Sequence, residues 1–93
     1  MFHLVVLLQI NTNSAADSLN ECFRGLFSKE NGVNSITFNR SWGNNLATFQ
    51  VTSSVPVRPD LCAKFLGAIE EDENATVIAA LDNSGLIDLS DPK

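Results

Sequence analysis

The stretch FHLVVLLQINTNSAADSLNECFRGLF, residues 2–27, decides the fold because its hydrophobic pattern changes period partway along. Residues 2–10 are almost uninterruptedly apolar, which is typical of a central β-strand that is covered on at least one side. From Ala15 onward the apolar residues return at intervals of three and four, the period of an amphipathic helix. Between the two segments, Ser14 followed by Asp17 predicts the helix start, and the Asn31-Gly32 pair predicts its end.

The next segment has the pattern of a β-hairpin. Residues 33–39 and 46–53 alternate apolar and polar side chains with period two, and they flank a turn-rich stretch at residues 40–45. The side chains expected to face the helices are Ile36, Phe38, Ala47, Phe49 and Val51. The opposite faces carry Ser35, Thr37, Asn39, Thr48, Gln50 and Thr52, which are polar but uncharged.

A second helix and a further strand complete the pattern. Pro59 suits the first turn of a helix, and Asp60 beside it is favoured at the positive end of the helix dipole. The acids at residues 70–73 are disfavoured at the negative end, so the helix is expected to stop there. Residues 76–81 predict a short apolar strand, and residues 86–89 are expected to return as a short extra strand.

The order strand, helix, strand, strand, helix, strand is the split βαβ pattern. Right-handed crossovers place both helices on one face of a four-stranded antiparallel sheet, with the strands at residues 2–10 and 46–53 in its centre. We therefore expect an α+β fold of the ferredoxin-like βαββαβ type, in which the other face of the sheet is open. A length of 93 residues fits a single domain over residues 1–93.

The charge balance favours some classes of partner over others. The chain has a net charge of −5 at pH 7, and its 6 Lys and Arg residues are scattered rather than gathered on one stripe. Such a surface repels phosphate, so we expect no nucleic-acid partner and a protein partner that is basic. The apolar run at residues 2–10 is shorter than the ~20 residues of a membrane span and follows no Lys or Arg. We therefore expect a cytoplasmic protein with no membrane contact.

The sequence offers no residues at the spacing of a known catalytic, metal or cofactor site. Cys22 and Cys62 lie far apart on the two predicted helices, and we expect buried thiols in a reducing compartment. His3 is the only histidine, and no acid or nucleophile is tied to it by spacing. The 5 glycines are isolated, so no phosphate-binding loop is present. We expect no catalytic residue, no metal and no cofactor.

Three surfaces are candidates for binding a protein partner: the hairpin turn, the open face of the sheet, and the acidic helix end. A tryptophan on a turn is a common binding anchor, although it could also fold back over its own hairpin. An apolar centre with an uncharged rim is typical of an interface, whereas an acidic helix end could also be simply solvated. The residues assigned to these surfaces are Trp42, Asn44 and Asn45; Val5, Leu7, Thr48 and Gln50; and Glu70, Glu71, Asp72 and Glu73.

These observations together favour a small, non-enzymatic module that binds a protein stoichiometrically. Inhibitors and antitoxin-like proteins of phages and mobile elements have this general profile, and self-association as a homodimer would help so small a core. Two alternatives stay open. One is a ferredoxin-like, metal-dependent ribonuclease in which Asp82 and Asp88 supply metal ligands. The other is a dimeric sensor that binds a small molecule between its subunits.

Overall fold

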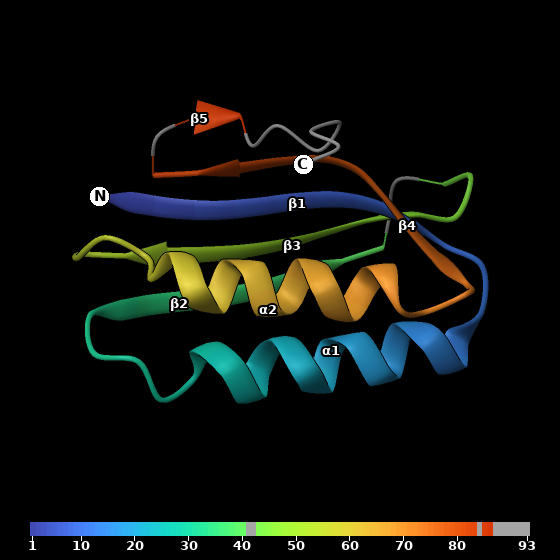
Figure 1. Cartoon of the computed structure of the whole chain (residues 1–93), viewed down its shortest axis with the longest axis horizontal. Helices are drawn as coiled ribbons and strands as arrows, with labels where there is room; N and C mark the ends of the chain where they lie inside the picture. Colours follow the sequence, from blue (N-terminus) through green and yellow to red (C-terminus); the bar gives the residue numbers. More distant parts are fainter. Residues whose placement is uncertain (41–42, 84, 87–93) are drawn as a thin grey trace.

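The computed structural model describes residues 1–40, 43–83 and 85–86, and it confirms the expected ferredoxin-like α+β sandwich. The elements are β1 (Phe2–Ile10), α1 (Asn13–Phe27), β2 (Val33–Asn39), β3 (Leu46–Ser53), α2 (Pro59–Glu70), β4 (Ala75–Asp82) and β5 (Gly85–Leu86). Neighbouring strands run antiparallel in the order β2-β3-β1-β4-β5, with both helices on one side of the sheet (Figure 1). The short β5 begins one residue before the predicted extra strand, and residues 87–89 of that prediction lie outside the described residues.

The period-two pattern places alternate side chains of β1 toward the helices. Leu4, Val6 and Leu8 are 0% exposed, and they pair across the sheet with helix-facing residues of β3. The pairing of Ile36 with Val51 continues this layer into β2. The two faces of the hairpin are therefore those predicted from the alternation.

Aromatic rings fill the space between the sheet and the helices. Phe23 of α1 is 0% exposed, and its ring centroid lies 5.2 Å from that of Phe27, 4.8 Å from that of Phe49 and 4.7 Å from that of Phe65. Phe38 stacks on Phe49 with a centroid distance of 4.4 Å. Rings at these distances bury a large apolar area and stabilise one another. This cluster connects α1, α2 and the sheet.

The ends of α1 differ from the prediction. The capping residue is Thr12, whose extended backbone precedes the helix and whose Oγ1 accepts a hydrogen bond of 3.0 Å from the amide of Ala15. Ser14 cannot cap because it already lies inside the helix. The helix ends at Phe27, and Gly32 lies in the following turn with φ 89, where its carbonyl accepts a 2.8 Å bond from the amide of Ser54. The α1–β2 connection is thereby fixed to the end of β3.

The second half of the chain follows the predicted boundaries closely. Pro59 begins α2 with Asp60 in its first turn, and the helix ends at Glu70 where the acidic run starts. A β-bulge interrupts β4, because Leu8 pairs with Val77 while Leu7 pairs with Ala79. Within the described residues, no helix has the length and apolar character needed to cross a membrane.

Candidate functional site

The face of the sheet that the helices leave uncovered is here called the open face. Its side chains alternate with those that face the helices along each strand. Its residues are His3, Val5, Leu7 and Gln9 of β1; Leu46, Thr48, Gln50 and Thr52 of β3; Ser35, Thr37 and Asn39 of β2; and Thr76, Ile78, Ala79 and Leu81 of β4. None of these residues is an Asp, Glu, Lys or Arg. Among the residues that the structure describes, the open face therefore has no side chain with a permanent charge.

The open face divides into two halves. Over β1 and β4 it is apolar: Val5 pairs with Leu81, and Leu7 pairs with Ala79. Leu81 is 42% exposed, and the bulge leaves Ile78 50% exposed, so Ile78 rather than Val77 joins this surface. The second half, over β3 and β2, is composed mainly of hydroxyl and amide side chains. The predicted residues Thr48 and Gln50 lie in this second half, and both are half-buried.

The predicted hairpin turn lies at the end of the sheet where β1 finishes. Asn44 and Asn45 have φ 55 and 63, and the amide of Leu46 donates a 2.9 Å hydrogen bond to the carbonyl of Gly43. Positive φ at both central residues is the geometry of a type I′ turn, which asparagine tolerates well. Both asparagines are exposed. Trp42 lies outside the described residues.

Backbone hydrogen bonds bring this turn and the acidic helix end to the same end of the molecule. The amide of Ile10 donates to the carbonyl of Asn45, and the amide of Asn11 donates to the carbonyl of Asn74, each over 2.8 Å. Figure 1 shows the three connections β1–α1, β2–β3 and α2–β4 meeting at this end. We call it the polar end, and its residues are Asn11, Asn44, Asn45, Glu70, Glu71, Asp72, Glu73 and Asn74.

Three acids of the polar end, Glu71, Asp72 and Glu73, border a groove between the two helices. Glu70, Glu71 and Glu73 are exposed, while Oδ1 of Asp72 accepts a 2.9 Å hydrogen bond from the amide of Asn74. The groove has a volume of ≈ 460 Å³. Its lining residues are Ser18, Leu19, Cys22, Ala68, Glu71, Asp72, Glu73 and Asn74. Within the described part of the chain, no ion pair joins any of the four acids at positions 70–73 to a cation.

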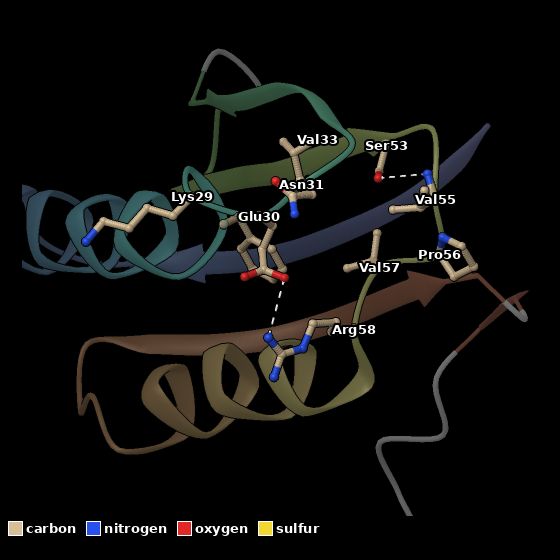
Figure 2. Close-up of a pocket in the computed structure, with 10 residues that line it drawn as sticks. Lys29, Glu30, Asn31, Val33, Ser53, Val55, Pro56, Val57 and Arg58 are labelled. Carbon is tan, nitrogen blue, oxygen red and sulfur yellow. Dashed lines mark hydrogen bonds and ion pairs between the residues drawn. The ribbon is translucent and has the colours of Figure 1, made fainter.

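A second pocket lies at the opposite end of the sheet, where Ser53 pairs with Phe2 (Figure 2). It has a volume of ≈ 310 Å³, with Phe27, Val33 and Val57 among its lining residues. Across it, Arg58 and Glu30 point toward each other and form an ion pair of 3.6 Å. Sequence reasoning missed this pocket, because two loops that are distant in the sequence form it and neither has a recognisable motif.

The charged groups at this pocket already engage one another. The Arg58 guanidinium donates two hydrogen bonds, of 3.1 and 2.7 Å, to the carboxylate of Asp60. This hydrogen bonding holds the pKa of the Asp60 carboxyl below its usual range, and it raises the pKa of Arg58. The carboxylates of Glu30 and Asp60 therefore share one guanidinium at the edge of the pocket.

Two of the residues considered for catalysis, His3 and Asp82, lie within the described part of the chain. His3 is exposed on the open face, whereas Asp82 is half-buried and belongs to the helix-facing set of β4. Asp88 lies outside the described residues. Across the described ranges, no group of three or more His, Cys, Asp or Glu side chains could hold a metal ion. His3 and Asp82 thus lie on opposite faces of the sheet, and the predicted pairing of Asp82 with Asp88 stays a prediction.

The two cysteines are free thiols in different environments. Cys62 of α2 is 4% exposed, and Cys22 of α1 is half-buried at the groove. Burial, together with the negative charge of Asp82, raises the pKa of the Cys62 thiol to about 11. Burial also raises the pKa of Cys22. Raised values keep both groups in the protonated form, which is a poor nucleophile.

Comparison with known proteins adds information about the fold alone. The sequence matches no protein-family model and no curated protein. The structure is similar to that of the uncharacterized protein TM1266 from Thermotoga maritima, with a TM-score of 0.59 and 16% sequence identity. The match covers 87% of this chain and 94% of that one. At this level of identity, the chain shares the fold of the Thermotoga protein.

Proposed function

We propose that the protein is a non-enzymatic binding module that acts stoichiometrically on a basic protein, as an inhibitor or antitoxin-like protein does. The observation that supports this proposal is the composition of the polar end. Exposed acids and exposed asparagine side chains meet there beside an open groove, and none of the four acids is in an ion pair with a described residue. A lysine- or arginine-bearing surface would find carboxylates without competing cations and carboxamides that accept hydrogen bonds.

The polar end would act in two ways. Its exposed carboxylates would attract a basic partner from a distance, because surface charges chiefly accelerate encounter. The groove would then receive a side chain from the partner, since Leu19 and Ala68 give it apolar walls between the helices. Trp42 is proposed from the sequence as an aromatic anchor beside the same turn.

The second candidate function is a sensor of a small molecule, and the pocket near Arg58 favours it, with the ligand bound within each chain rather than between subunits. Its volume of ≈ 310 Å³ lies at the lower end of the range for ligand pockets. Apolar residues and a few converging charged groups line it, which is the usual composition of such sites. Thermal-shift screening with metabolites would test this candidate, and stabilisation that Arg58→Ala abolishes would favour it.

The test of the proposed function compares two pairs of substitutions that remove the same charge. The variant Glu71→Gln/Glu73→Gln neutralises acids of the polar end, and Asp17→Asn/Glu21→Gln neutralises exposed acids of α1. The partner is recovered from host lysate with the wild-type chain, identified by mass spectrometry and purified. Association is then followed by stopped-flow fluorescence. We expect the first variant to slow association roughly tenfold at low salt and little at high salt, because salt screens exposed charges.

Two outcomes would contradict the proposal. Equal on-rates for the wild type and Glu71→Gln/Glu73→Gln at low salt would leave the acids as a solvated helix end. Cleavage of RNA by the purified chain with magnesium or manganese, abolished by Asp82→Asn, would make the protein a nuclease instead. We expect titration calorimetry to show a one-to-one complex that Glu71→Gln/Glu73→Gln weakens more than Asp17→Asn/Glu21→Gln does.

A further inference from the structure

We propose that the open face binds a second copy of this chain, so that two molecules stack sheet against sheet. The inference goes beyond the proposed function because it concerns the side of the molecule that faces away from the helices. The apolar half, with Val5 and Leu7 of β1 and Ile78 and Leu81 of β4, lies at the two-fold axis. The hydroxyl and amide side chains of β3 and β2 form the rim.

The distribution of charge supports a second copy as the occupant. Two chains of net charge −5 repel each other, yet none of the acids that the structure describes lies on the open face. The described acids of α1 and α2 lie in the helix layer, on the side of the sheet opposite the open face (Figure 1), and two sheets that stack face to face are themselves about 10 Å apart. In the stacked pair, the helix acids of opposite copies are separated by two sheets and by more than the Debye length of about 8 Å at physiological salt. The repulsion among these acids is therefore largely screened.

The polar groups of the open face can also form hydrogen bonds with the same face of a second copy. In a two-fold interface the same patch occurs on both sides, so every group meets the chemistry of its own surface. A lysine or glutamate patch would then face like charge. Threonine, serine and glutamine side chains both donate and accept hydrogen bonds, so Gln50 or Thr52 can pair with the same residue type across the axis. A specifically basic partner would gain no ionic contact from this face.

The size of the open face predicts a weak dimer. Four strands at a spacing of about 4.8 Å and a length of about eight residues at about 3.3 Å each give a flat area of about 500 Å². A standard stable interface buries about 800 Å² per partner, so this one lies near the lower end of specific interfaces. We therefore expect a dissociation constant of roughly 10–100 μM, so the dimer would form at high protein concentration and dissociate in dilute assays.

The test is sedimentation equilibrium of the full chain from about 1 μM to about 1 mM, a range that brackets the expected constant. The wild type should rise from the 10.1 kDa of the monomer toward twice that mass. Ile78→Glu places a charge on the apolar half at a side chain that is already 50% exposed, so folding should survive. We expect this variant to raise the dissociation constant at least about tenfold, because the charge is desolvated in the interface. Ala63→Glu adds the same charge on the exposed side of α2 and should leave the constant unchanged.

A second variant protects the test against misfolding. Gln50→Glu has nearly the same shape as the wild type and introduces a charge on β3, so it should also weaken the dimer. Circular dichroism and thermal melting verify that each variant is folded. A wild-type mass of 10.1 kDa at every concentration would overturn the inference, and so would equal weakening by Ala63→Glu and Ile78→Glu. Neither result bears on the acids of the polar end, so the proposed function is tested separately.

Discussion

The buried thiol of Cys62 predicts that the protein loses stability at alkaline pH. Burial and the charge of Asp82 raise the pKa of this thiol to about 11 in the folded chain, against 9.0 for an ordinary cysteine. Between these two values the unfolded chain releases its proton while the folded chain keeps it. The unfolded state then binds fewer protons, so the free energy of unfolding falls as the pH rises. The contribution of the protonated Cys62 thiol to the free energy of unfolding is complete below pH 9 and is lost as the pH rises through 11.

The size of this loss of stability follows from the shift in the pKa of Cys62. At pH 10.5 a thiol with these two pKa values lowers the free energy of unfolding by about 2 kcal/mol. A chain of this length has a total stability of about 5–14 kcal/mol, so the loss is readily measurable. The chain has no tyrosine, which removes one group that commonly titrates in this range.

Urea unfolding at pH 7.5 and pH 10.5 measures the effect in the wild type and in Cys62→Ala. The variant loses some packing at both values, but its stability should fall about 2 kcal/mol less between them because the thiol is gone. Cys22→Ala is the matched control, since that thiol is only half-buried whereas Cys62 is 4% exposed. Identical pH dependence in the wild type and Cys62→Ala would refute the reasoning.

Two further predictions concern the core and the α1–β2 turn. Phe23→Ala should lower the free energy of unfolding by about 3–5 kcal/mol, because the ring is 0% exposed among three other rings. If urea unfolding shows a loss of less than about 1 kcal/mol, the cluster is loosely packed. Gly32→Ala should cost about 1–3 kcal/mol in the same assay, since φ is 89 and the added Cβ would lie 2.7 Å from Cγ2 of Val55. The double variant Gly32→Ala/Val55→Ala removes the contact but not the backbone strain, so it should recover part of the loss caused by Gly32→Ala, and no recovery would assign that loss to the backbone alone.

The features that the sequence predicted well depend on local periodicity. Alternation in residues 33–39 and 46–53 assigned each side chain to its face, because a strand with one buried face tolerates only one register. Pro59 marked the start of α2 because its ring fixes a helical φ and needs no hydrogen-bonded amide. In both cases the residue itself carries the structural requirement.

The features that were missed depend on contacts between distant segments. Ser14 and Thr12 both have capping side chains, and the path of the chain out of β1 decides between them. The bulge that exposes Ile78 arises from the pairing of β4 with β1, which the sequence of β4 alone does not specify. Glu30 and Arg58 meet only because two loops converge at the same end of the sheet.

The two proposed surfaces lie on different sides of the molecule, and this arrangement has a consequence for function. When two copies stack through their open faces, both helix layers face outward, so the pair presents two polar ends to its surroundings. A partner with two basic sites would then bind both copies, and the second contact would form at a high effective concentration. The weak dimer would thereby gain stability from such a partner, since a ligand that binds the dimer more tightly than the monomer shifts the equilibrium toward the dimer. The polar end alone would still bind a partner with a single basic site, in a one-to-one complex with the monomer.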